Sequence, residues 1–100
     1  MAKKVTEVKN KQGFRIIVMP GIVPHVLFNK YACDLCGKKI DLEEDIYYEA
    51  VINNFYCETC HKAYLSNAIR YKSDIKNEEK NFNKAKEELE GAEWWNETLF

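Results

Sequence analysis

Two cysteine pairs constrain this chain more than any other feature of its sequence. Each pair has the form C-x2-C, and the chain contains four cysteines in all: Cys33, Cys36, Cys57 and Cys60. In a reducing compartment this spacing favours a metal site over disulfides, because two thiolates on one tight turn can converge on one ion. The twenty residues between the pairs can fold back to complete a tetrahedral site. The sequence therefore predicts one zinc ion bound by all four cysteines.

The predicted zinc is structural. Four thiolates fill a tetrahedral shell and leave no position for water or substrate, so we expect a protein that is not an enzyme. His61 directly follows the last cysteine, and its expected role is to support the site from outside, with replacement of Cys60 as a ligand the alternative. Lys38, Lys39 and Lys62 also flank the pairs and can offset the negative charge of the thiolates.

Other metals and chemistries fit the sequence less well. Rubredoxin-type iron sites usually have glycine after both cysteine pairs, whereas His61 follows the second pair here. A thiol redox centre would need a βαβ context, which is missing. His25 has no neighbouring acid or nucleophile motif, and the acidic run 41–45 lacks the ligand pattern of a calcium loop. No catalytic residue is therefore predicted.

Length and charge restrict the class of protein. A chain of 100 residues forms at most one domain, small enough for a metal ion to add materially to its stability. With 15 basic and 16 acidic residues, it has no overall attraction to nucleic acid or membranes. Its longest apolar run, 16–19, is far shorter than the roughly 20 residues of a membrane helix. We expect a soluble cytoplasmic protein without a secretory signal.

The first part of the chain has the pattern of two β-hairpins. Gly13–Met19 and Ile22–Phe28 are predicted to be strands joined by a turn at Pro20-Gly21. A second hairpin is predicted over residues 46–56, with its turn at Asn53-Asn54. This hairpin would lead the chain to the second cysteine pair.

The second part of the chain has the composition of a helix. Residues 58–90 contain no glycine or proline, and Gly91 supplies a stop, so one long helix is the simplest prediction. A break at Ser73-Asp74 is the alternative, because both residues favour helix starts. We expect a single domain with a zinc-stapled β-rich part, 1–72, and an acidic helical extension with an aromatic tail, 73–100.

The predicted helix carries an apolar stripe with steps of three and four residues, typical of a coiled coil and interrupted only by Glu78. Its positions are Ala68, Tyr71, Ile75, Glu78, Phe82, Ala85, Leu89 and Ala92. The stripe can form a homodimer seam or pack on the chain's own hairpin. Trp94 and Trp95 can likewise dock on the domain or anchor a partner. The candidate partner-binding residues are therefore Phe82, Leu89, Trp94 and Trp95.

The motif C-D-L-C-G-K-K-I, followed by a hairpin and then Y-C-E-T-C-H at a helix start, resembles the treble-clef class of zinc fingers. The second finger of LIM domains is the most similar type. The resemblance covers about residues 31–72 and implies a zinc knuckle, a hairpin and a helix that supplies the last two ligands. The chain lacks the preceding finger of a LIM domain. The overall expectation is an α+β zinc-binding domain with an N-terminal hairpin and a long C-terminal helix.

The leading functional hypothesis is an interaction module that binds a protein partner. The amino-acid composition is rich in Lys, Asn, Ile and Tyr, which suggests an AT-rich genome. Short chains of this kind are common in phages and mobile elements. By analogy, we expect a small inhibitor of a host system, such as an anti-CRISPR protein, that acts in the host cytoplasm. The alternative is a zinc finger that binds nucleic-acid phosphates. Its candidate contacts are Lys3, Lys4, Lys9, Lys11, Arg15, Lys38, Lys39, Lys62, Arg70 and Lys72. A treble-clef nuclease is not expected, because the helix after Cys60 lacks the His and Asn set of such enzymes.

Overall fold

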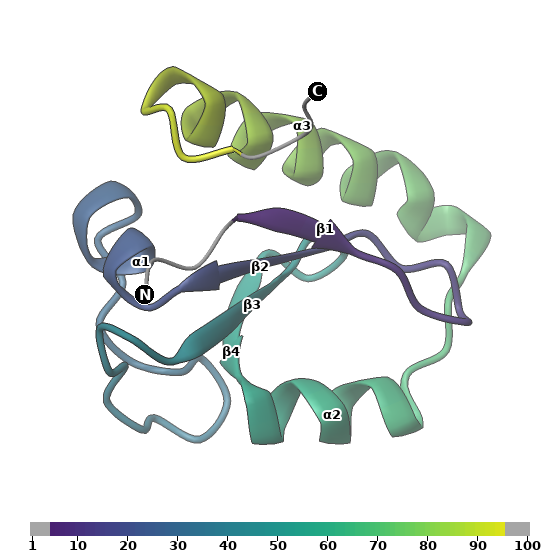
Figure 1. Ribbon diagram of the computed structural model, residues 1–100. Helices are drawn as coiled ribbons and strands as arrows, with labels where there is room; N and C mark the ends of the chain where they lie inside the picture. The colour runs from purple at the N-terminus through teal and green to yellow at the C-terminus, as the bar shows by residue number, and fades with distance from the viewer. Residues whose placement is uncertain (1–4, 96–100) are drawn as a thin grey trace.

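The computed structural model describes residues 5–95 and shows an α+β fold built on one antiparallel sheet (Figure 1). The sheet contains four strands in the spatial order β1-β2-β3-β4. These are β1 (Thr6–Val8), β2 (Ile16–Pro20), β3 (Asp45–Glu49) and β4 (Asn54–Cys57). Each strand therefore pairs with its neighbour in sequence, and the α+β prediction is confirmed.

The N-terminal hairpin exists, but the predicted partner strand is wrong. β2 pairs with β1, with Thr6 opposite Val18 and Val8 opposite Ile16. The segment predicted as its partner instead forms a short helix, α1 (Ile22–Leu27). Pro24 is compatible with this helix because N–H groups in the first turn have no intrahelical acceptor to lose.

The second hairpin is confirmed. β3 and β4 pair in antiparallel register, with Tyr48 opposite Phe55 and Glu49 opposite Asn54. Asn53 adopts a positive φ of 55° in the turn between them, a conformation that asparagine tolerates better than most residues. The last residue of β4 is Cys57, so the hairpin delivers the second cysteine pair as predicted.

The prediction of one continuous helix is wrong, and the alternative break is confirmed. The chain forms α2 (Glu58–Asn67), a 3₁₀ turn η1 (Lys72–Asp74) and α3 (Ile75–Gly91). The two long helices lie on opposite sides of the sheet, so the chain must leave the helical path to pass from one side to the other (Figure 1). No helix within residues 5–95 is long and apolar enough to cross a membrane.

The main core lies between the sheet and α3. Alternate residues of the strands, including Ile17 and Met19 of β2 and Tyr48 of β3, contribute to it. From α3 it receives Phe82, Ala85 and Leu89. The second half of the predicted apolar stripe therefore packs on the chain's own sheet. Its first half does not, since Tyr71 and Ile75 are exposed.

Glu78 interrupts the stripe as a buried carboxylate with two half-buried polar partners. One carboxylate oxygen accepts the backbone N–H of Arg15 at 2.7 Å, and the other accepts an N–H from the Arg70 guanidinium at 2.7 Å. The residue is only 1% exposed. It thus connects α3 to the start of β2 and to the linker that follows α2.

Candidate metal centre

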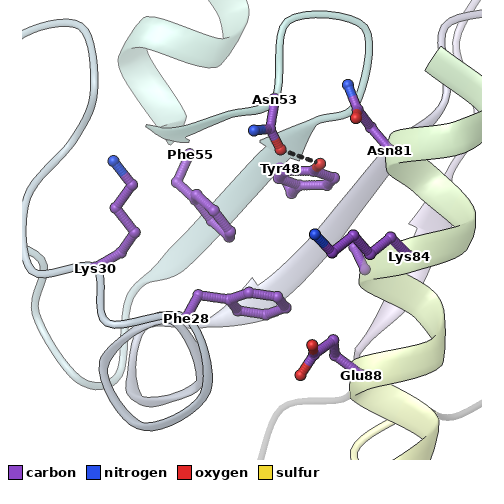
Figure 2. Close-up of a pocket in the computed structure, with 9 residues that line it drawn as sticks. Phe28, Lys30, Tyr48, Asn53, Phe55, Asn81, Lys84 and Glu88 are labelled. Carbon is purple, nitrogen blue, oxygen red and sulfur yellow. Dashed lines mark hydrogen bonds between the residues drawn. The ribbon is translucent and has the colours of Figure 1, made fainter. Parts of the chain in front are cut away.

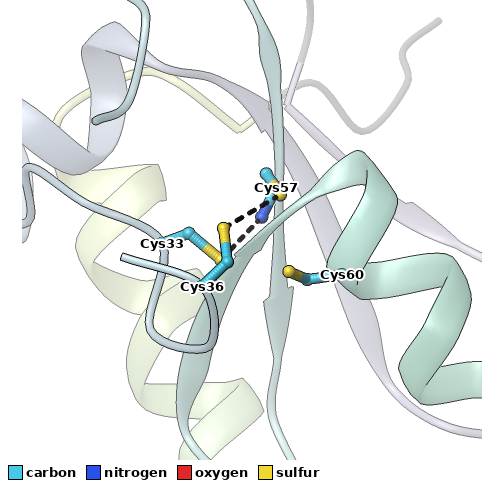
Figure 3. Close-up of side chains that lie close together, drawn as sticks. All are labelled: Cys33, Cys36, Cys57 and Cys60. Atoms are coloured by element: carbon cyan, nitrogen blue, oxygen red, sulfur yellow. Dashed lines mark hydrogen bonds between the residues drawn. The ribbon is translucent and has the colours of Figure 1, made fainter. Parts of the chain in front are cut away.

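The two cysteine pairs, twenty residues apart in sequence, form one cluster (Figure 3). All four are free thiols, and their sulfur atoms lie within 4.8 Å of one another. The Cys36 and Cys57 sulfurs are 3.9 Å apart, too far for a disulfide. With metal–sulfur distances of about 2.3 Å, a tetrahedral site requires sulfurs about 3.8 Å apart. The cysteines are therefore positioned to bind one metal ion.

The first pair lies on a short turn closed by backbone hydrogen bonds. The Gly37 N–H donates to the Cys33 carbonyl at 3.0 Å, and the Cys33 N–H donates to the Lys38 carbonyl at 2.9 Å. Gly37 has a φ of 77°, a left-handed conformation that glycine adopts without steric cost. We call residues 33–38 the knuckle.

Asp34 fastens the knuckle to the sheet. Its backbone N–H donates to the Phe55 carbonyl at 2.8 Å, and its carboxylate accepts the Phe55 N–H at 2.7 Å. Lys30 forms an ion pair with the same carboxylate. These bonds cover backbone groups on the outer edge of β4 and bring the first cysteine pair beside the second. No local sequence pattern predicts these bonds, because Asp34 and Phe55 are distant along the chain.

The second pair lies where β4 becomes α2. Cys57 is the N-cap of α2 in extended conformation, with φ −69° and ψ 167°, and Cys60 lies in the first turn. Free N–H groups and the positive end of the helix dipole occur at such a position and stabilise negative sulfur. The predicted placement of this pair at a helix start is confirmed.

The thiols of Cys33 and Cys60 differ in pKa because their burial and hydrogen bonding differ. Burial raises the pKa of Cys33, but hydrogen bonds from the backbone N–H groups of Cys36, Cys57 and Leu35, and from Cys60, outweigh this effect and lower the pKa to about 7. The Leu35 and Cys57 nitrogens each lie 3.4 Å from the Cys33 sulfur. Cys60 has its pKa raised to about 12, mainly by desolvation and then by its hydrogen bonds with the other thiols and the charge of Cys33. A bound divalent cation would offset the electrostatic repulsion between four neighbouring thiolates.

The contacts of His61 do not place it as a metal ligand. Its Nδ1 lies 2.5 Å from a carboxylate oxygen of Glu49, and its ring stacks on Tyr47 with centroids 4.0 Å apart. His61 and Glu49 are both buried. Desolvation raises the pKa of Glu49, and the hydrogen bond and charge of His61 act in the opposite direction. The His61–Glu49 pair connects α2 to β3. No sequence pattern pointed to Glu49 as the partner of His61.

Two of the three flanking lysines pair with carboxylates. Lys38 lies 3.6 Å from Glu44, and Lys62 lies 3.3 Å from Glu58 in the adjacent turn of α2. All of these side chains except Glu44 are more than half exposed, so the pairs contribute little stability.

The four candidate partner-binding residues all belong to or touch the main core. Phe82 is 1% exposed and Leu89 is fully buried, so neither presents a surface. Trp94 and Trp95 are half-buried and pack against the same core. The Trp95 ring lies edge-on to Phe82 at 6.2 Å. The tryptophans thus dock on their own domain, one of the two arrangements considered for them.

No protein-family model, curated protein or solved structure gives a significant match to the chain. The functional interpretation therefore depends on the geometry of the cysteine cluster and of the surrounding surface.

Proposed function

We propose that the chain is a non-enzymatic interaction module in which one structural zinc ion joins the knuckle, the β3–β4 hairpin and α2 in a treble-clef arrangement. The observation that carries this proposal is the convergence of four thiol sulfurs within 4.8 Å. Four sulfur ligands complete a tetrahedral shell, so the metal has no open position for substrate.

The donor set supports zinc. Thiolates are soft ligands that suit zinc, and four of them in tetrahedral geometry are typical of its structural sites. Three of the four cysteines are buried, which shields the metal from water. When bound, the ion cross-links the cysteine pairs and offsets the charge of their thiolates.

An exposed apolar surface lies next to the knuckle and supports the assignment to protein binding. Its members, which we call the α1 surface, are Ile22, Val26, Tyr31 and Leu42. Ile22 and Val26 are one turn apart on α1, and the Ile22 N–H donates to the Leu42 carbonyl at 2.9 Å. Val26 is 63% exposed and Tyr31 is 53% exposed. Exposed apolar side chains that gather in one patch are a feature of protein-interaction sites.

The α1 surface is connected to the metal site through the residues that flank the knuckle. The Ile40 N–H donates to the Tyr31 carbonyl at 2.9 Å, and Ala32 and Lys39 form an antiparallel bridge. His25 of α1 lies 3.1 Å from the Ile40 carbonyl through its Nε2. Loss of the metal should therefore disorder the binding surface as well as the cysteine cluster.

Site-specific photo-crosslinking tests this proposal. A photoreactive amino acid at Val26 should capture a discrete protein from cells that express the chain, whereas the same amino acid at exposed Glu79 should not. The Cys57→Ser substitution should abolish capture at Val26. Equal capture from both positions, or capture that survives loss of the cysteine, would contradict a metal-dependent surface.

Nucleic-acid binding is a second candidate, favoured by one observation. Lys72, Lys76 and Lys80 recur at every fourth residue, and none has an ion-pair partner within residues 5–95. The two arginines of the original candidate set are occupied, since Arg15 pairs with Glu7 and Arg70 with Glu78. Lys3 and Lys4 of that set lie outside the described residues. Binding that weakens steeply with salt would favour this candidate.

A further inference from the structure

A pocket of about 340 Å³ lies between α3 and the end of the sheet, on the side of the molecule where the main core is found (Figure 2). Its volume is at the lower end of the range for small-ligand sites. It contains none of the cysteines and does not depend on the proposed function.

One wall of the pocket is aromatic. Phe55 contacts Phe28 with ring centroids 5.1 Å apart and Tyr48 with centroids 4.8 Å apart, at interplanar angles of 45° and 44°. Tyr48 and Phe55 are buried core residues, whereas Phe28 is only half-buried. These three rings present apolar surface to a planar group of similar size.

The other wall is polar and includes a cation with no partner. Lys84 of α3 extends its ammonium group into the pocket, toward the Tyr48 ring (Figure 2). It has no ion-pair partner within the described part of the chain. Lys30, on the opposite side, is already paired with Asp34. Lys84 is thus the positive charge available to a ligand.

Asn53 and Glu88 make the two ends of the pocket electrostatically different. The Tyr48 hydroxyl donates to the side-chain amide oxygen (Oδ1) of Asn53 at 2.5 Å, which fixes the Asn53 side chain and leaves its Nδ2 N–H groups to donate elsewhere. Glu88 lies at the other end of the pocket, beyond Lys84 (Figure 2). Its carboxylate repels an anion there, so a negative group is favoured beside Lys84 and Asn53.

We propose that this pocket binds a single aromatic ring that carries an anionic group. The ring lies against Phe28 and Phe55, and the anion lies beside Lys84 and Asn53. An aryl phosphate has this chemistry, and it can come from a free small molecule or from a phosphotyrosine side chain of a peptide. The ammonium and the amide N–H groups supply charge-assisted hydrogen bonds to such an anion.

Amide NMR of the ¹⁵N-labelled full chain tests the proposal with two probes, phenyl phosphate and a phosphotyrosine pentapeptide. Phenyl phosphate should shift the resonances of Asn53, Phe55 and Lys84 with a Kd on the order of 1 mM, as expected for so small a ligand. Equal affinities for both probes would identify a small-molecule site, and much tighter binding of the peptide would identify a phosphopeptide site. Both outcomes support the pocket.

Three controls make the test specific. Lys84→Gln should weaken phenyl phosphate binding at least about fivefold, whereas Lys80→Gln, one turn earlier on α3 and outside the pocket, should not. Cyclohexyl phosphate, which has the charge but no aromatic ring, should bind more weakly than phenyl phosphate. Inorganic phosphate should not shift Phe55. The proposal is overturned if neither aromatic probe shifts the pocket resonances, or if both lysine variants bind equally well.

Discussion

At the residue scale, the four cysteines are positioned to bind one metal ion, and protons would compete with that ion for their sulfurs. Cys60, with a pKa of about 12, is almost fully protonated at pH 7, and Cys33, with a pKa of about 7, is about half protonated. Metal binding must displace these protons, so the affinity falls as the pH falls. Cys60 alone should make the affinity rise about tenfold per pH unit between pH 7 and 9.

Calorimetry measures this proton release directly. Zinc titrations at pH 7 in two buffers of different ionisation enthalpy should report at least one proton released per ion, from Cys60, plus a contribution from Cys33. Release of clearly less than one proton would mean that the cluster is already ionised and that the thiols are not coupled as described.

Gly21 is required by a close approach of two backbones. A Cβ atom at this position would lie 1.9 Å from the Asp41 carbonyl oxygen. The Gly21 N–H also donates to the Glu44 carbonyl at 2.8 Å, so the chain cannot move away without losing this bond. Gly21→Ala should lower the free energy of unfolding by about 2–4 kcal/mol, measured by urea denaturation of the zinc-loaded protein.

Gly91 provides the matched control, since a Cβ there meets nothing within 4 Å. Gly91→Ala should be neutral or stabilising by up to about 1 kcal/mol, because alanine favours the helix. If the two alanine variants have the same stability, the packing described around Gly21 is incorrect.

Sequence reasoning identified residues whose role is set by their immediate neighbours. The two C-x2-C pairs can be recognised from their spacing alone, and the clustering of their four sulfurs was predicted. Other roles depend on contacts between distant residues. Gly21 lies against Asp41, Asp34 bonds to Phe55, and Glu49 bonds to His61. These contacts exist only after distant segments meet, so no local pattern could reveal them.

At the element scale, hydrophobic patterning predicted the β3–β4 hairpin and the position where the second helix starts. It failed at α1, because a short apolar segment with proline fits an edge strand and a first helical turn equally well. It also predicted a single helix that spans residues 58–90, because this segment contains no glycine or proline. Tertiary structure breaks that helix. Ala68 and Tyr71 are extended, with ψ of 142° and 143°, as the chain crosses from one face of the sheet to the other.

Glu78 is the residue that holds this crossing in place. Replacing it by leucine completes the apolar stripe of α3, but it also leaves the Arg15 N–H and the Arg70 guanidinium without their acceptor. Glu78→Leu should therefore lower the free energy of unfolding by about 2–4 kcal/mol, since unpaired buried polar groups are costly. Exposed Glu79 supplies the control, and Glu79→Leu should change stability by less than about 0.5 kcal/mol in the same denaturation experiment. A stabilised Glu78→Leu protein would show that the stripe matters more than the ion pair.

At the scale of the whole molecule, two cores share one sheet. The larger core lies against α3, and a separate small core contains Cys33, Tyr56, Cys57 and Cys60. The small core has few apolar side chains of its own. Structural zinc contributes on the order of 10 kcal/mol in small fingers, comparable to the stability of an entire domain. We therefore expect the knuckle and the β3–β4 hairpin to depend on the metal.

Native mass spectrometry with and without a chelator tests whether one metal ion holds the cysteine cluster together, because it reports bound metal and unfolding in the same spectrum. We expect one zinc ion per chain, lost together with a shift to the higher charge states of an unfolded protein. A metal-free protein whose mass shows two disulfides, or a fold that is unchanged after the zinc is removed, would contradict it.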